Sequence, residues 1–156
     1  MSQKILIPLD GSLLGETALH HVKEMISELE LESKVEVILF QAITSLTYAV
    51  TAGDEAVEIP YTAVELEQVR EQAMEYLKKT AEYLEDNGIP VRCEVAIGTS
   101  SAEEIIAAEN TLKADLVAMS THGRHGITRW AFGSVADKVL RGSTVPVLIV
   151  RMPDKG

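Results

Sequence analysis

Short apolar runs alternate with amphipathic stretches along this 156-residue chain, and the alternation limits its fold more than any other feature. The runs have the length of buried strands, and the stretches between them repeat apolar residues every three or four positions, as helices do. Strands that alternate with helices build a parallel sheet through right-handed crossovers. We therefore expect one α/β domain over residues 1–156, with a five-stranded parallel sheet, helices on both faces and a polar tail at 152–156. The strands are expected at residues 4–9, 35–43, 91–97, 116–119 and 147–150.

Capping residues predict where the helices begin and end. Ser12 is expected to cap the first helix, and Ser100 or Ser101 the third. The second helix is expected over residues 64–87, where Asn87-Gly88 and then Pro90 form a stop signal.

The third strand fixes the expected strand order. Its apolar residues alternate with Arg92 and Glu94, a pattern typical of a strand with one exposed face at the edge of a sheet. With that strand at one edge, the order 3-2-1-4-5 places the first and fourth strands side by side. Ligands of open α/β sheets bind in the crevice between the loops that follow two such strands. Asp10, directly after the first strand, is expected to line the crevice; a plain Asp-Gly turn is the alternative.

The fourth strand runs into a polar loop with glycines and then into a new helix, all within residues 116–134. Gly123, Gly126 and Gly133 let the backbone approach a ligand, and Ser134 can cap the helix or donate to a phosphate. Free N–H groups at a helix N-terminus attract anions. A bound anion and a merely solvated loop explain these features equally well.

The net charge of −10, from 24 acidic and 14 basic residues, limits the partners of this chain. An acidic surface repels nucleic acid and anionic membranes, so neither is expected as a partner. Residues 120–142 are the exception, because they hold four basic residues against Asp137 alone. This basic island suits a negatively charged ligand. Its basic residues are Arg124, Arg129, Lys138 and Arg141.

The N-terminal residues and the number of cysteines indicate the cellular compartment of the protein. The apolar run at residues 5–9, interrupted by Pro8, is too short for a signal peptide or a membrane span. The single cysteine, Cys93, cannot form an internal disulfide and is expected as a small apolar residue of the core. A cytoplasmic protein is the expectation that follows.

The spacing within residues 116–134 resembles the nucleotide loop of the universal stress protein family. ATP-binding members of that family carry Gly, two residues, Gly, nine residues, and then Gly followed by Ser or Thr. Here the second glycine of the pattern is Gly123, and the closing pair is Gly133-Ser134. The first position holds Ser120, which departs from the pattern. The resemblance extends from the first strand to the last and implies an adenine nucleotide alpha hydrolase-like, Rossmann-like fold.

The same resemblance implies a site and a ligand. ATP or another adenine nucleotide, with Mg²⁺, would bind at the carboxyl edge of the sheet. Asp10 would lie near the ribose or the metal, and backbone groups near Ala42 would contact the adenine. The residues expected to bind nucleotide are Pro8, Leu9, Asp10, Ala42, Met119, Ser120, His122, Gly123, Arg124, Gly133, Ser134 and Val135.

Two further segments bear on partners. The strand that begins at Val145 and ends at Val150 is apolar, carries no charge and occupies the second edge of the expected sheet. Such an edge pairs readily with another chain, so we expect a two-fold homodimer joined through this strand, as is common in the family it resembles. Residues 44–61 are expected to form a long loop, either disordered at the surface or folded over the site.

No catalytic constellation is apparent in the sequence. His122 and His125 lack the further ligands of a zinc site, and no P-loop spacing is present. Because no general base is evident, ATP hydrolysis would be slow at most. The favoured function is an ATP-binding regulatory module of the stress response. A stress-protein dimer that acts only through an unknown protein partner is the second candidate, and an enzyme or receiver-type domain is the third.

Overall fold

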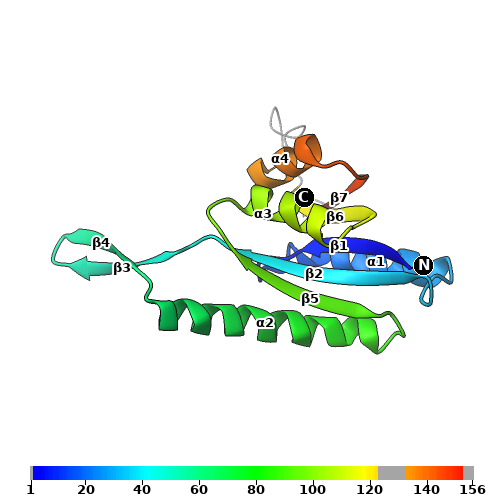
Figure 1. The fold of residues 1–156 in the computed structure, drawn as a ribbon, viewed down its shortest axis with the longest axis horizontal. Helices are drawn as coiled ribbons and strands as arrows, with labels where there is room; N and C mark the ends of the chain where they lie inside the picture. The colour runs from blue at the N-terminus through cyan, green and yellow to red at the C-terminus, as the bar shows by residue number, and fades with distance from the viewer. Residues whose placement is uncertain (1, 123–132, 153–156) are drawn as a thin grey trace.

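The computed structural model describes residues 2–122 and 133–152 of the chain. These residues form a five-stranded parallel sheet in the order β5-β2-β1-β6-β7 and a separate two-stranded hairpin (Figure 1). Counted along the chain, the order within the sheet is 3-2-1-4-5, so the predicted fold class and strand order are confirmed. The strands of the sheet are β1 (Gln3–Pro8), β2 (Val35–Ile43), β5 (Val91–Ile97), β6 (Leu116–His122) and β7 (Val147–Met152).

Two helices pack on each face of the sheet, and the apolar core is divided accordingly. Along β2, Leu39 and Ile43 pack with the first helix pair, whereas Ile38 and Phe40 pack with the second. Burial on both faces explains why the central strands are continuous apolar runs without alternation. The first pair is α1 (Glu16–Glu28) and α2 (Ala63–Glu85), and the second is α3 (Ser101–Thr111) and α4 (Ser134–Gly142).

The observed helix cap matches the predicted one for the third helix but not for the first. Ser100 caps α3, because its hydroxyl accepts a hydrogen bond from the N–H of Glu103 at 3.3 Å. α2 begins with a capping box, in which Thr62 and Glu65 each accept a hydrogen bond from the other's N–H. Ser12 does not cap α1, which begins four residues later, after Gly15.

Residues 44–61 contain a β-hairpin, which corrects the expectation of a loop. Strand β3 (Thr47–Ala52) pairs antiparallel with β4 (Glu55–Pro60) around the turn Gly53-Asp54. Gly53 has φ +67°, a conformation that two-residue hairpin turns need and glycine adopts readily. The hairpin extends away from the sheet (Figure 1), and none of its residues lines the pocket described below. It therefore does not fold over that pocket.

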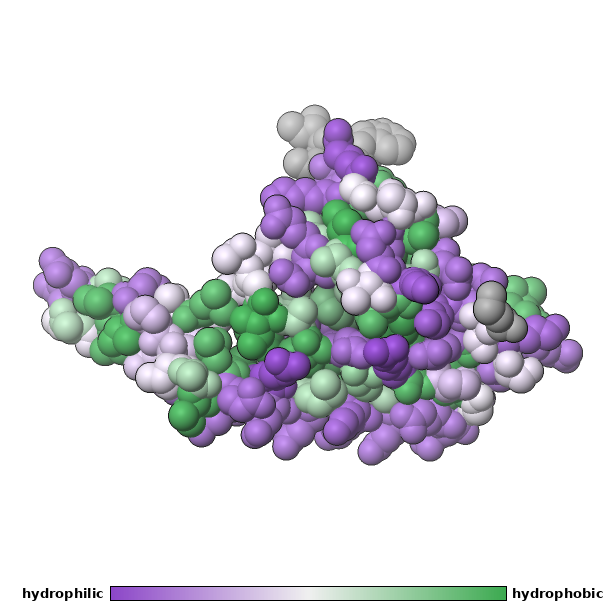
Figure 2. All heavy atoms as spheres, in the orientation of Figure 1, coloured by the Kyte–Doolittle hydropathy of each residue, from purple (hydrophilic) through white to green (hydrophobic). Residues whose placement is uncertain are grey.

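Two smaller expectations concern α2 and Cys93. The outer face of α2 is hydrophilic along its length (Figure 2), as its many glutamates predict. Cys93 on β5 is partly buried and packs against the core between α2 and the sheet. Burial, and next the Glu85 carboxylate, raise the pKa of the Cys93 thiol, so it stays protonated at neutral pH.

In the part of the chain that the structure describes, no helix has the length and apolar character to span a membrane.

Candidate functional site

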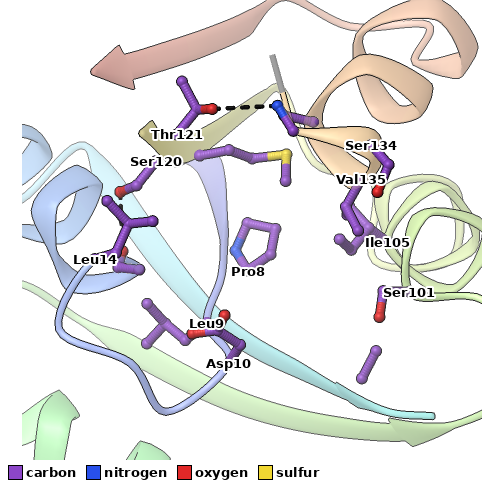
Figure 3. A pocket seen from close by; sticks show the side chains of 15 residues that line it. Pro8, Leu9, Asp10, Leu14, Ser101, Ile105, Ser120, Thr121, Ser134 and Val135 are labelled. Carbon is purple, nitrogen blue, oxygen red and sulfur yellow. Dashed lines mark hydrogen bonds between the residues drawn. The ribbon is translucent and has the colours of Figure 1, made fainter. Parts of the chain in front are cut away.

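A pocket of about 300 Å³ opens at the carboxyl edge of the sheet, where β1 and β6 lie side by side and the helices that follow them, α1 and α4, lie on opposite faces (Figure 3). This is the topological switch point at which ligands of open α/β sheets bind. The walls come from the end of β1 and its loop, from β2 and β6, and from the first turns of α3 and α4. The lining residues are Pro8, Leu9, Asp10, Leu14, Gly15, Ala42, Ser101, Ile105, Met119, Ser120, Thr121, Gly133, Ser134, Val135 and Ala136.

Most of the sequence-predicted site residues meet at this pocket. They are Pro8, Leu9, Asp10, Ala42, Met119, Ser120, Gly133, Ser134 and Val135. Of the others, His122 is the last residue of β6, and Gly123 and Arg124 lie outside the described residues. That any of these residues binds nucleotide stays a prediction.

Sequence reasoning missed six residues that line the pocket. Thr121 was assigned to a loop, but β6 continues to His122, three residues beyond the expected end of the strand. The other five lie in or beside helices. Sequence position was the one indication that they could line a site, because several of them fall just after a strand or at a helix start, where ligands of open sheets bind. They are Leu14, Gly15, Ser101, Ile105 and Ala136.

The hydroxyl of Ser120 binds the first turn of α1. It accepts a hydrogen bond from the N–H of Ala18 at 2.7 Å and donates one to the carbonyl of Gly15 at 3.1 Å. Gly15 is the N-cap residue of α1 and offers no side-chain cap of its own. Ser120 thus satisfies an orphan donor of that helix from a strand that lies 102 residues away in sequence. In Figure 3 its side chain points toward α1 and the Leu14 turn.

The loop between β1 and α1 is built around Asp10. Its Oδ1 atom accepts hydrogen bonds from the N–H of Ser12 at 2.9 Å and from the Ser12 hydroxyl at 2.5 Å. The Ser12 hydroxyl in turn accepts a hydrogen bond from the N–H of Gly15 at 3.2 Å, so Ser12 serves the turn that precedes α1 and not the helix itself. A Cβ atom on Gly15 would lie 3.2 Å from Oδ1 of Asp10, so glycine allows the helix start to lie close to this carboxylate.

The N-terminus of α4 faces the pocket. Gly133, its N-cap residue, makes no side-chain cap, so N–H groups of the first turn remain for a ligand. The N–H of Gly133 donates to Oγ1 of Thr121 at 3.4 Å, a long hydrogen bond (Figure 3). A Cβ atom on Gly133 would meet no described atom within 4 Å. Among the described residues, none blocks the approach of an anion to this helix end.

The basic island predicted from the sequence contributes little to the described walls. Arg141 is paired with Asp137 on the surface of α4, with Nε 3.2 Å from each carboxylate oxygen. Lys138 is exposed, and none of the described lining residues is a lysine or arginine. Arg124 and Arg129 lie outside the described residues. In the described part of the pocket, attraction for an anion therefore comes from helix N-termini.

The described side chains do not form a metal centre. Among residues 2–122 and 133–152, no cluster of three or more His, Cys, Asp or Glu side chains is placed to hold an ion. A magnesium ion at this pocket would find Asp10 as its carboxylate ligand and would otherwise depend on phosphate oxygens of a bound nucleotide. That division of ligands is usual for Mg²⁺, which prefers few carboxylates together with substrate phosphates.

Comparison with known proteins identifies the family. A model of the universal stress protein family matches residues 1–151. The chain belongs to that family. It is 32% identical over 153 residues to universal stress protein MJ0531 of Methanocaldococcus jannaschii, which covers 98% of this chain and 84% of the relative. It is 30% identical over 161 residues to universal stress protein MJ0577 of the same organism, covering 97% and 96% of the two chains.

Solved structures of the universal stress protein family show the same fold. The structure of MJ0577 superposes with a TM-score of 0.71 at 26% identity and covers 99% of both chains. UspA of Lactobacillus plantarum superposes with a TM-score of 0.68 at 17% identity, covering 96% of this chain and 97% of that one. The resemblance inferred from the glycine spacing is therefore confirmed at the level of family and fold.

Proposed function

We propose that this universal stress protein binds an adenine nucleotide, with ATP as the expected ligand, and acts as a cytoplasmic regulatory module of the stress response. The observation that carries the proposal is the N-terminus of α4. It begins at a glycine, has no side-chain cap and faces a pocket at the switch point of the sheet. Such a helix end binds phosphate groups through its free N–H groups and its dipole.

Two solved relatives support the class of ligand. A universal stress protein in complex with cAMP shares the fold with a TM-score of 0.63 at 18% identity, covering 97% of this chain and 98% of that one. A family protein of Arabidopsis thaliana with AMP bound has a TM-score of 0.66 at 12% identity, covering 97% and 92% of the two chains. At these identities the likeness is one of fold. The two complexes favour an adenine nucleotide, and the proposal extends this to ATP with Mg²⁺.

The pocket walls suit the two ends of such a ligand. The phosphates would lie at the N–H groups of Ser134 and Val135, in the first turn of α4. The base would lie against the apolar part of the wall, which includes Ala42, Ile105 and Met119. Magnesium would offset the phosphate charge, with Asp10 as the one carboxylate among the described lining residues.

The proposal predicts direct binding. Small molecules released from freshly purified protein are expected to include an adenine nucleotide, identified by mass spectrometry. Calorimetric titration of the stripped protein with Mg-ATP is expected to give a dissociation constant in the micromolar range. Parallel titrations with AMP, cAMP and metal-free ATP rank the ligands and test the metal, and Mg-GTP controls for recognition of the base. No nucleotide after purification and no heat up to millimolar Mg-ATP would overturn the proposal.

A homodimer through β7 is the second part of the proposal. β7 pairs with β6 on one side only and forms an edge of the sheet, with its apolar residues partly exposed. A two-fold axis beside this edge would let β7 pair antiparallel with its copy and extend the sheet across both chains. Sedimentation equilibrium at micromolar concentration is expected to give twice the chain mass of 17.0 kDa. A single-chain mass at that concentration contradicts the dimer without affecting the nucleotide proposal.

A further inference from the structure

Neighbouring residues at the end of β6 bind the N-termini of two helices on opposite faces of the sheet. Ser120 binds the first turn of α1, and Thr121 accepts a hydrogen bond from the N–H of Gly133 at the start of α4. Side chains alternate along a strand, which is why adjacent residues reach opposite faces. Both helix starts line the pocket (Figure 3).

Of these two contacts, the one made by Ser120 controls a longer stretch of the pocket wall. Asp10, Leu14 and Gly15 all belong to the connection between β1 and α1, and all three line the pocket. Within the described residues, the side-chain hydrogen bonds internal to that connection are local, between Asp10, Ser12 and Gly15. Ser120 instead joins the end of the connection to a buried strand of the central sheet. Its hydroxyl therefore ties the end of the connection to β6.

We propose that Ser120 is a positioning residue of the pocket, whose hydroxyl holds the start of α1 and the Asp10 loop in the conformation that receives the ligand. The inference rests on the proposed function of this pocket as a nucleotide site. A wall that is already ordered before binding need not be ordered by the ligand, so the affinity of the folded protein is higher. Ser120 acts through α1 and the loop, because its hydroxyl is committed to Ala18 and Gly15.

The glycine pattern of the family predicts that glycine at position 120 favours ATP binding, and the contacts of Ser120 predict the opposite. Position 120 is the one described position where this chain departs from the glycine spacing of ATP-binding members. If the serine were only a tolerated departure, restoring glycine would leave binding unchanged or improve it. A glycine has no hydroxyl to bind Ala18 and Gly15, and it also loosens the strand. Ser120→Gly is therefore expected to weaken binding.

The experiment measures Mg-ATP affinity of folded variants by calorimetry, well below their unfolding temperatures. Ser120→Ala and Ser120→Gly each lose both hydrogen bonds of the hydroxyl and are expected to bind about three- to tenfold more weakly than the parent protein, a loss on the scale of an ordinary hydrogen bond. Ser120→Thr keeps the hydroxyl on a residue that strands favour, and it is expected to bind within about twofold of the parent. Parent-like affinity in Ser120→Thr would show that the weaker binding of the other two variants comes from loss of the hydroxyl and not from substitution in general.

Thr62→Ala is the matched control. Thr62 also satisfies a helix start, by accepting from the N–H of Glu65 at 3.2 Å, but it caps α2 and does not line the pocket. Its loss is expected to lower the unfolding temperature much as Ser120→Ala does and to leave the affinity unchanged. Parent-like affinity in Ser120→Ala, or an equal loss of affinity in Thr62→Ala, would overturn the positioning role.

Hydrogen exchange of the ligand-free protein tests the inference separately from the proposed function. Ser120→Ala is expected to speed amide exchange at Ala18 and across residues 10–18, while Thr62→Ala leaves those amides unchanged. Should the parent protein bind no nucleotide, the proposed function fails, and the exchange experiment still decides whether Ser120 orders the loop. Unchanged exchange at Ala18 in Ser120→Ala would overturn the inference by itself.

Discussion

Gly133→Val is expected to weaken Mg-ATP binding by about 100-fold or more, because at least two charge-assisted hydrogen bonds to the phosphates would be lost. Gly133 has φ −60° and ψ 157°, a conformation that valine adopts without strain. A Cβ atom there meets no described atom within 4 Å, so the folded protein is expected to accept the side chain. The valine would stand where phosphate approaches the N-terminus of α4. Calorimetric titration measures the loss.

Ala56→Val is the matched control for this substitution. Ala56 lies on the exposed strand β4, so the variant adds a β-branched side chain outside the pocket. Its affinity is expected to equal that of the parent, and thermal unfolding of both variants checks that they remain folded. If Gly133→Val binds Mg-ATP as tightly as the parent does, the phosphates do not lie at α4 and the proposed orientation of the ligand is wrong.

Glu109→Ala is expected to lower the free energy of unfolding by about 3 kcal/mol, because it removes a fully buried acceptor and leaves several partly buried hydrogen bonds unmade. Glu109 lies on α3 and is 1% exposed. Its carboxylate accepts from the N–H of Thr144 at 2.8 Å and from the Thr144 hydroxyl at 2.9 Å, and also from the Ser143 hydroxyl. These residues connect α4 to β7, so one side chain ties α3 to the turn that leads into the edge strand.

Thermal or denaturant unfolding measures this effect. For a domain of this size, the loss corresponds to a fall in the unfolding temperature of about 6–12 °C. Glu109→Gln keeps the shape and one acceptor oxygen, so its loss is expected to be smaller than that of the alanine variant. Glu94→Ala is the control, since its ion pair with Arg92 at 2.7 Å is partly exposed and is expected to contribute no more than about 1 kcal/mol. A Glu109→Ala variant as stable as Glu94→Ala would contradict the role of the carboxylate.

Much of the fold can be predicted from the periodicity of apolar residues along the sequence. The ranges of β2 and β5 match those expected from apolar patterning, and the charges at Arg92 and Glu94 correctly placed β5 at an edge. The hairpin was not recognised, although Tyr48, Val50, Val57 and Ile59 alternate with other residues around a Gly-Asp turn. That pattern predicts a hairpin, whereas the expectation of a loop rests on the length of the connection alone. An α/β sheet does not need such a hairpin, so the fold class gave no reason to expect it.

The sequence predicts the site residues that lie at the ends of strands and the starts of helices. It does not predict those that reach the pocket only through the packing of one element against another. Asp10, Gly133 and Ser134 were expected because the ends of strands and the starts of helices gather at one edge of a parallel sheet. Ser101 and Ile105 complete the same pocket from α3. Their presence depends on how closely α3 packs beside β2, which no local pattern in the sequence reports.

The amino-acid sequence by itself determined the alternation of strands and helices, the strand order and the glycine spacing that places this chain in its family. The helices, the strands and the glycine spacing are local properties, because each depends on periodicity, capping or spacing within a short stretch. The strand order follows from them once the charges at Arg92 and Glu94 place β5 at an edge. Only the tertiary structure decided that Ser120 caps α1 and that Glu109 is a buried acceptor. Each role depends on a hydrogen bond between residues far apart in sequence, 102 positions for Ser120 and Ala18 and 35 for Glu109 and Thr144. Such partners meet only once the helices have packed on the sheet, and in these partly buried places a hydrogen bond left unmade costs stability.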